Sequence, residues 1–378
     1  MSELAPDRLE HFPFLETGPA YRLFERMPMA PARRVVLLVA LAWLPLALLS
    51  RLTPESALTV TFFADLVVQI RLLLALPIYL LCVPFIERGI QLCVSEFVVC
   101  DIVTERDSYA AILRSTQRLL DSKLVDAILL LAAFVRSFAY FRLHPGSSWL
   151  GMHPATSPTP AGWWFAIVSL PLIYYVACWW LWRVFVWIYF LSRVARLKLN
   201  LIATHPDRAG GMGFISATQM RFAYLASGSN AVISADIAML ILVRGDRLED
   251  FQILIPMIIV VHVGLIIAPL FFFSNQLVTC ARIGKRLYGR LATEYVRDFQ
   301  GKWMAGKNAG EPLLGTADIQ SLADLANSHD VVSGMRMVPL KRFDLIQTVA
   351  IVAAPFVPLL LTIVPAKELL KLVLSLLK

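Results

Sequence analysis

Long apolar runs alternate with short polar segments along the chain, and seven of the runs are long enough to cross a bilayer. A helix needs about 20 apolar residues to span about 30 Å of hydrocarbon. The runs lie near residues 35–51, 58–83, 124–142, 163–191, 220–243, 251–274 and 345–364. Backbone polar groups find no water partners in lipid, so each run is predicted to be a transmembrane helix in an all-α bundle.

Three of the remaining segments are predicted to be helical outside the membrane. Glu87 to Lys123 is predicted to be one helix, and Asn275 to about Met304 a basic helix that continues directly from the sixth run. A shorter helix is expected over 316–337, and the tail 365–378 is predicted to lie along the outer membrane surface as an amphipathic helix. The first of these carries an apolar stripe at helical spacing: Tyr109, Ile112, Leu113, Thr116, Leu119 and Leu120.

The distribution of lysine and arginine predicts the orientation. Segments 1–34, 84–123 and 192–221 carry five each, and 275–344 carries ten. In contrast, segments 52–57 and 143–162 carry none and the loop 244–250 carries two. Because cytoplasmic loops are the ones enriched in these residues, the N-terminus is predicted to be cytoplasmic and the C-terminus to be outside.

Composition excludes a soluble globular protein. Hydrophobic residues make up 58% of the 378 residues and charged residues only 16%, whereas soluble domains carry about a quarter charged residues. The net charge of +8 is explained by the cytoplasmic loops, which favour contact with anionic membrane lipids and not with nucleic acid. The five cysteines form no CxxC pair, so neither a metal site nor a cofactor is predicted.

One polar loop stands out between the fourth and fifth runs, with the sequence "HPDRAGGMGF". Arg208 and freed backbone amides could hold a phosphate as an anion cradle, or act as a gate. Alternatively, Asp207 caps the loop and the glycines permit positive φ in a structural turn. The residues that these alternatives share are His205, Asp207, Arg208, Gly210 and Gly211.

The same loop carries a family resemblance. Together with "ADIQSLADLANSHDVVSGMRMVPL" (317–340) before the last run, it resembles a group of bacterial integral membrane proteins that has no established activity. The resemblance covers the fourth to the seventh run. It implies a multi-pass protein of the bacterial inner membrane and names no reaction.

Ionisable residues inside membrane spans are costly and mark functional or paired positions. Within the runs they are Asp65, Arg71, Asp126, Arg136, Arg183, Asp236 and His262. Three of them, Asp65, Arg136 and Asp236, are each about seven residues from the outer end of their run, or roughly 10 Å deep. Arg136 is therefore predicted to lie between the two carboxylates, as a structural ion pair or as a charged ring at the mouth of a pathway.

The fifth run is the most polar. Ser227, Asn230 and Ser234 share one helical face, which predicts a helix at the centre of the bundle or beside a water-filled path.

Three functions compete. The first is a homo-oligomeric ion channel or small-solute transporter with this helix along the path. The second is a membrane sensor or assembly factor that binds a cytoplasmic protein partner, and the third is a membrane enzyme acting on a lipid or phosphorylated substrate. The runs carry no HExxH, GxSxG or paired-carboxylate motif, which disfavours the enzyme.

Overall fold

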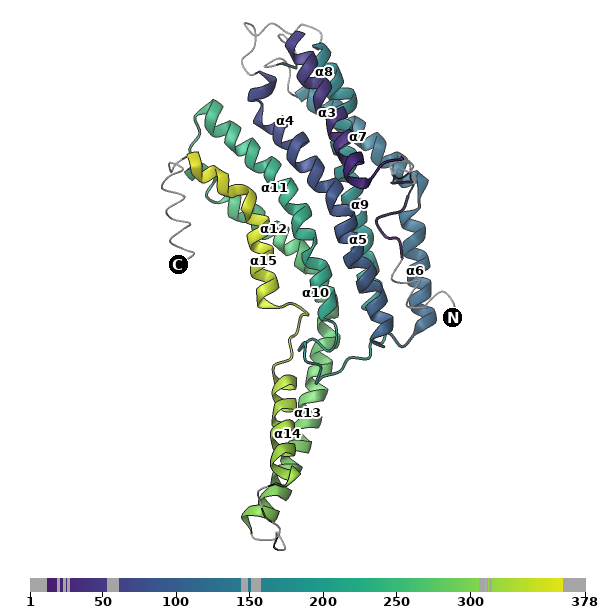
Figure 1. Ribbon diagram of the computed structural model, residues 1–378, viewed down its shortest axis with the longest axis vertical. Coiled ribbons are helices and arrows are strands. Elements are labelled where there is room, and N and C mark those ends of the chain that lie inside the picture. The colour runs from purple at the N-terminus through teal and green to yellow at the C-terminus, as the bar shows by residue number, and fades with distance from the viewer. Residues whose placement is uncertain are drawn as a thin grey trace.

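The computed structural model of the chain is a bundle of long helices (Figure 1). It describes residues 12–18, 21–22, 25, 28–52, 61–143, 149–150, 158–305, 310, 312 and 315–362. The predicted helix of the tail 365–378 lies outside these residues. The principal α-helices are α3 (Pro31–Leu49), α4 (Leu66–Ile70), α5 (Leu76–Val99), α6 (Arg106–Leu120), α7 (Lys123–Leu143), α8 (Pro160–Trp164), α9 (Leu170–Val194), α10 (Gly213–Met220), α11 (Phe222–Met239), α12 (Leu254–Ile267), α13 (Ser274–Phe299), α14 (Ala317–Ser333) and α15 (Arg342–Ala353).

Six helical stretches in the described part of the chain are long and apolar enough to cross a membrane. They are Pro31–Leu52, Leu66–Val99, Pro160–Val194, Gly213–Arg244, Leu248–Met304 and Arg342–Thr362. Each contains, or largely overlaps, one of the predicted runs, and several extend well beyond it. An all-helical protein with six such helices is compatible with a multi-pass integral membrane protein.

The remaining predicted run, 124–142, coincides with α7, which is not among these six helices. Lys123, Asp126 and Arg136 interrupt its apolar surface. The helix packs along the length of α9. Much of its outward surface is apolar, and Leu124 and Leu131 are 71% and 65% exposed, although Lys123 and Arg136 are exposed as well. An exposed leucine face is what a lipid-facing helix presents.

Several irregular helical segments extend or interrupt the spans, and four of them matter for the site. The π-helical segments η5 (Arg71–Ala75), η6 (Phe165–Ser169) and η7 (Leu240–Arg244) adjoin α4, α8 and α11. The 3₁₀ segment η11 (Ala354–Thr362) ends the last span and contains Pro355 and Pro358. Proline removes the backbone donor that an α-helix needs and clashes with the preceding turn. The tighter helix at η11 therefore follows from the sequence.

The helix α11 lies in the middle of the bundle, in contact with α4, α5, α12, α15 and η11. The other helices, α3, α7, α8 and α9, pack on the far side of α4 and α5 (Figure 1). Small residues along α11, such as Ala231 and Ala235, are buried at these contacts. Their small side chains let neighbouring backbones approach closely.

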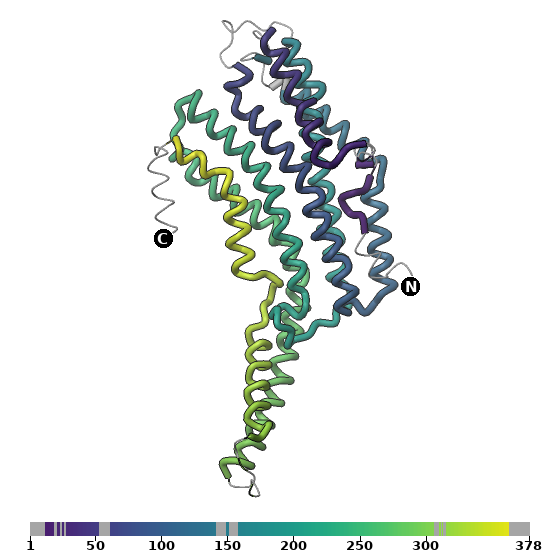
Figure 2. Tube along the Cα trace, viewed as in Figure 1, coloured from purple at the N-terminus to yellow at the C-terminus, as the bar shows by residue number. Residues whose placement is uncertain are grey.

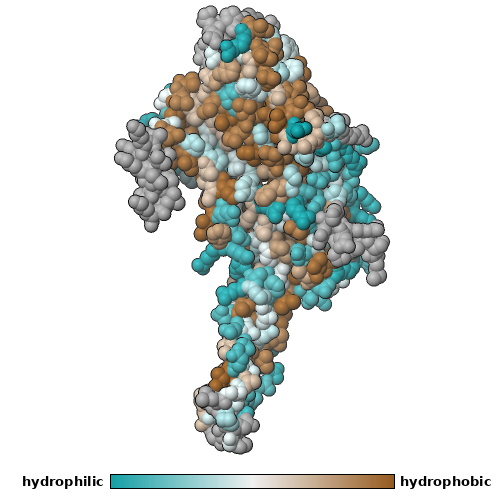
Figure 3. Space-filling view, viewed as in Figure 1, coloured by the Kyte–Doolittle hydropathy of each residue, from teal (hydrophilic) through white to brown (hydrophobic). Residues whose placement is uncertain are grey.

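A helical hairpin of α13 and α14 projects from one end of the bundle (Figure 2). As the sequence predicts, α13 continues from the sixth span, through the 3₁₀ segment η9 (Ala268–Phe273). The space-filling view shows hydrophobic residues gathered over the bundle and many polar residues over the hairpin and beside α6 (Figure 3). This division matches a membrane-embedded part and a part in water.

The prediction of one helix from Glu87 to Lys123 is wrong. The chain leaves α5 at Cys100, and α6 begins at Arg106. Asp101 takes a positive φ of 50°, and the amide of Asn200 donates to the carbonyl of Ile102 at 2.8 Å. The break therefore depends on a pairing with a distant loop. The predicted stripe of α6 is confirmed, since Tyr109 and Thr116 are fully buried and the helix packs on α9.

Candidate functional site

A cavity of about 400 Å³, half open to the surface of the bundle, lies along α11. One wall is formed by α4, η5 and α5, including Ile70 and Leu74, and another by η11. The third wall is α11 itself, where Ser227 and Ser234 contribute the hydroxyls. Two of the three residues predicted to share one polar face of this helix, Ser227 and Ser234, therefore line one cavity.

The cavity is mainly apolar, and its polar groups are partly satisfied within the helix. The hydroxyl of Ser227 donates to the carbonyl of Tyr224 at 2.7 Å, and Ser234 is 6% exposed. A hydroxyl that donates to its own helix keeps its acceptor lone pairs for a passing water or ligand. The wall therefore has an apolar surface with isolated acceptors.

The third predicted residue, Asn230, faces another helix. Its Nδ2 donates to the carbonyl of Val352 on α15 at 2.8 Å, and the side chain is fully buried. The Oδ1 atom has no hydrogen-bond partner in the described part of the chain. A buried acceptor without a partner costs about 1–3 kcal/mol. Asn230 thus links α11 to the last span at the expense of one unsatisfied atom.

Irregular helix surrounds this cavity on three sides. Leu74 belongs to η5, Leu242 to η7, and Pro355 and Pro358 to η11, and all four line the cavity. A π-helical or 3₁₀ segment displaces carbonyls from the regular i→i−4 pattern, and such segments are frequent at functional sites and hinges. The cavity therefore lies where the helices are least regular.

The predicted charged cluster does not form ion pairs among the described residues. The guanidinium of Arg136 lies 5.5 Å from the centre of the Tyr174 ring. Asp65 caps α4 by accepting from the amide of Val68 at 3.2 Å, and it accepts from Trp149 Nε1 at 3.1 Å. Among the described residues, no ion pair within 4 Å joins Arg136 to Asp65 or Asp236. Distance from the end of a span predicts a height in the membrane and does not predict an angular position around the helix.

His262 is a half-buried residue of α12. Its Nδ1 lies 3.0 Å from the carbonyl of Ile258, one turn earlier in the same helix. Among the described residues, no group of three or more His, Cys, Asp or Glu side chains could hold a metal ion. The described contact of His262 is therefore local to its helix.

The loop "HPDRAGGMGF" is organised by Asp207. Its Oδ1 accepts from the amides of Ala209 at 2.8 Å and Gly211 at 3.2 Å, and its Oδ2 accepts from Gly213 at 2.8 Å. His205 Nδ1 lies 2.8 Å from Oδ1. Partial burial opposes ionisation of this carboxylate, but the amides and His205 outweigh it, so the pKa of Asp207 is held below its ordinary value. The amides that could cradle a phosphate thus surround the chain's own carboxylate.

The other conspicuous residues of the loop bind the hairpin. The guanidinium of Arg208 forms an ion pair with Asp330 of α14 at 2.9 Å. Arg336 donates to the carbonyls of Asp207 and Leu340, and its amide donates to the carbonyl of Arg208. Arg208 itself adopts a left-handed φ of 53°. The loop therefore joins the end of α9 to the base of the hairpin.

Both glycines of the loop are required by the backbone. Gly210 and Gly211 have φ values of 66° and 95°, which side chains with a Cβ rarely adopt. A Cβ on Gly211 would lie 3.0 Å from Ile102, and one on Gly210 would lie 3.1 Å from Leu201. The turn is therefore both left-handed and tightly packed.

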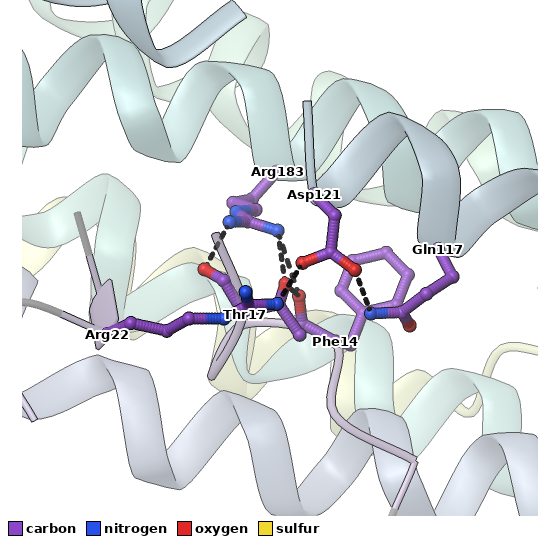
Figure 4. A network of polar contacts seen from close by, with 6 residues as sticks. All are labelled: Phe14, Thr17, Arg22, Gln117, Asp121 and Arg183. Carbon is purple, nitrogen blue, oxygen red and sulfur yellow. Dashed lines mark hydrogen bonds and ion pairs between the residues drawn. The ribbon is translucent and has the colours of Figure 1, made fainter. Parts of the chain in front are cut away.

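A buried clamp holds the N-terminal arm, and no predicted site residue belongs to it. Arg183 of α9, 1% exposed, donates to the carbonyls of Phe14 and Thr17 at 3.1 and 2.7 Å and to the Thr17 hydroxyl at 2.8 Å (Figure 4). Glu87 of α5, 2% exposed, accepts from the amides of Phe14 and Leu15 at 2.8 and 2.5 Å. Phe14 and Leu15 are fully buried, and the Phe14 ring packs edge-on against Trp187. One short peptide is thus bound through both its donors and its acceptors.

The sequence carries one signal for this clamp. The otherwise polar arm contains Phe12, Phe14 and Leu15 close together, and Arg183 is an ionisable residue in an apolar run.

Comparison of the chain with protein-family models, curated proteins and solved structures finds no match. The class of the protein therefore rests on its own helices, which are compatible with an integral membrane protein.

Proposed function

We propose that the chain is a multi-pass protein of the bacterial inner membrane that conducts ions or small solutes as a homo-oligomer, with α11 along the path. The observation that carries the proposal is the cavity of about 400 Å³ that Ser227 and Ser234 line. Cavities of this size hold small ligands. Isolated hydroxyls on an apolar wall can replace part of a solute's hydration without binding it tightly.

Seven spans, with the N-terminus cytoplasmic and the C-terminus outside, are part of the proposal. The exposed apolar face of α7 and the arginine-rich hairpin support this topology. A single cysteine in place of Arg247, 75% exposed, should react with an impermeant thiol reagent from outside. One in place of Met304, 74% exposed, should not react in intact cells. Both variants need a background in which the exposed Cys100 is serine. The reverse labelling pattern would contradict the topology.

The functional test is ion and solute flux into liposomes that contain the purified chain. Ser234→Phe fills the cavity and is expected to reduce flux at least tenfold, because the added ring occupies the proposed path. Val261→Phe is the matched control, since Val261 lies on α12 and is 52% exposed. Size-exclusion chromatography with light scattering establishes that both variants keep the oligomeric state of the natural chain. Equal flux through the two variants would refute the path along α11.

A second function is favoured by the hairpin. Ile283, Leu287 and Leu291 repeat at every fourth residue of α13, and they are 53%, 60% and 50% exposed. An apolar stripe on a helix in water is typical of a surface that binds another helix. The chain would then be a sensor or assembly factor for a cytoplasmic protein partner. Absence of flux for every ion and solute, together with a partner that Leu287→Asp releases, would favour this function over transport.

A membrane enzyme is the least supported alternative. It would use His205, Asp207 and Arg208 at the level of the inner headgroups. However, the Asp207 carboxylate already receives the loop amides, and Arg208 pairs with Asp330. A phosphorylated substrate would have to displace the chain's own carboxylate from three amides. Activity that survives Arg208→Ala would exclude this arginine from any such site.

A further inference from the structure

A second cavity, of about 330 Å³, lies between α3, α5 and α9. It shares no lining residue with the cavity along α11. Residues of the clamped N-terminal arm, Glu16 and Tyr21, close one end of it. Because the clamp of Glu87 and Arg183 fixes this arm, the cavity has a defined end wall.

The interior of this cavity is an apolar shaft. Along α9 the lining runs from Trp180 through Val176 to Leu172, a distance of about 12 Å at 1.5 Å per residue. Leu38 of α3 and Leu80 of α5 line the opposite sides. A mainly apolar shaft of this depth accommodates a hydrocarbon chain better than a hydrophilic solute. Its wall also includes Tyr79, whose hydroxyl bonds to Ser229, and Tyr175, whose hydroxyl has no partner in the described part of the chain.

The end of the shaft beside the arm is polar and carries both signs of charge. Its lining there includes the carboxylate of Glu16, the phenol of Tyr21 and the guanidinium of Arg34. Arg34 is held in place because its Nε donates to the carbonyl of Met29 at 2.8 Å. Burial, followed by the charge of Glu16, raises the pKa of the Tyr21 phenol, which therefore stays a neutral hydrogen-bond donor at every physiological pH.

The cavity also reaches the surface that faces lipid. Leu81 lines it and is 53% exposed, and Pro31 at the start of α3 is exposed and lines it as well. A molecule can therefore enter sideways from the bilayer. A ligand from the aqueous phase would need no such lateral opening.

We propose that this cavity binds one membrane phospholipid whose headgroup is zwitterionic and carries a primary ammonium, as phosphatidylethanolamine does. Its phosphate lies at Arg34, its ammonium at Glu16, and one acyl chain lies in the shaft between Leu80 and Leu172. Arginine recognises phosphate through a planar set of donors. The carboxylate of Glu16 accepts hydrogen bonds from an ammonium, whereas a quaternary amine offers it none. An anionic headgroup without an amine, such as that of phosphatidylglycerol, offers this carboxylate no cation. The site is independent of the proposed transport function.

The test measures lipids retained by the purified full-length protein in detergent by native mass spectrometry. The probes are phosphatidylethanolamine, phosphatidylcholine and phosphatidylglycerol with identical acyl chains. The natural chain is expected to retain phosphatidylethanolamine about tenfold better than the other two, as one charge-assisted hydrogen bond provides. Glu16→Gln should abolish the preference over phosphatidylcholine, and Glu25→Gln, an exposed position of the same arm outside the cavity lining, should not.

Two further pairs of variants test the phosphate site and the shaft. Arg34→Gln should lower retention of all three lipids about tenfold, and the adjacent Arg33→Gln, outside the lining, should leave it unchanged. Leu172→Trp fills the shaft and should abolish retention, whereas Leu181→Trp, which faces outward and is 71% exposed, should not. Unfolding temperatures establish that the variants fold. If Leu172→Trp does not fold, the arginine pair decides. Equal retention of the three lipids by the natural chain, or equal effects within the arginine pair, would overturn the proposal.

Discussion

Replacement of Arg183 by methionine should release the N-terminal arm while the bundle stays folded. Methionine has a similar length and keeps the apolar packing, but it cannot donate a hydrogen bond. The carbonyls of Phe14 and Thr17 and the hydroxyl of Thr17 would lose their shared donor in a site where Phe14 is 0% and Thr17 is 3% exposed. The buried carboxylate of Glu87 would also lose the nearby positive charge.

The magnitude follows from these contacts. Breaking a buried charged contact by removing one partner costs about 3–5 kcal/mol. In the natural chain, Arg183 Nε has no partner in the described part of the chain, so its burial opposes docking of the arm. Methionine removes this unsatisfied atom, and part of the cost is recovered. A net change of about 3 kcal/mol corresponds to a roughly hundredfold larger population of the undocked arm.

Limited proteolysis measures this population. Arg22 is exposed and ion-paired with Asp121 at 2.8 Å, and it lies directly beyond the clamped peptide, so trypsin should cut after it only when the arm has left its site. When opening and closing are fast relative to cleavage, the cleavage rate follows the open population. Arg183→Met should therefore accelerate this cut by about two orders of magnitude. Arg193→Met, an exposed position on the same helix, is the control.

The clamp also makes a prediction about additivity. Arg183 and Glu87 bind the same peptide from opposite sides, so the combined Arg183→Met and Glu87→Gln variant should lose less than the sum of the single effects. An acceleration below about threefold in Arg183→Met, or one equal to that of the Arg193→Met control, would show that the arm is held by its buried apolar residues and that the clamp is incidental.

Three further predictions concern the loop at the base of the hairpin, and thermal unfolding of the protein in detergent checks each of them. Gly211→Val should destabilise the protein by at least about 1 kcal/mol, because φ there is 95°, whereas His205→Ala should change stability by less than that. Asp207→Asn should cost about 2 kcal/mol at pH 7, because a charged acceptor of three amides is lost. Since the pKa of Asp207 is lowered by folding, this contribution is present above its unfolded pKa of about 3.9 and is lost as the pH falls through the lower folded value. The two proteins should therefore converge in stability below about pH 4, and a difference that does not depend on pH would contradict the role given to the charge.

The positions of the helices could be predicted from the sequence because they depend on local patterns. Apolar run length locates the spans, and the stripe of α6, with Tyr109 and Thr116, faces the bundle as expected. The continuation of the sixth span into α13 was equally visible, since no proline interrupts the chain from Ser274 to Phe299. The break at Asp101 was not visible, because it depends on hydrogen bonds to residues near Asn200.

The candidate sites needed information that periodicity does not contain. Ser227 and Ser234 could be assigned to one face of α11, but the cavity they line also depends on Ile70 of α4 and Pro355 of η11. Depth from the membrane surface placed Arg136 level with Asp65 and left their directions around the helices undetermined, and Arg136 stacks on Tyr174 instead. Contacts between segments that are distant in the sequence decide each of these cases.

The hairpin and the α11 cavity are joined by a chain of hydrogen bonds along the last span. At the base of the hairpin, Arg336 and Arg208 bind the backbone and side chains of the two connecting segments. Further along, Ser216 of α10 donates to Asp344 at 2.8 Å, and Asn230 of α11 donates to Val352. The helix α15 therefore cannot rotate or slide against α10 and α11 without breaking polar contacts at both of its ends. The segment η11 continues directly from α15 and forms a wall of the cavity. A displacement of the hairpin would therefore change the chain either in the segment before Arg342 or at the prolines of η11. The regular hydrogen bonds of α15 make it stiff, so such a displacement would change the conformation of one or both of these two segments and not of α15 itself.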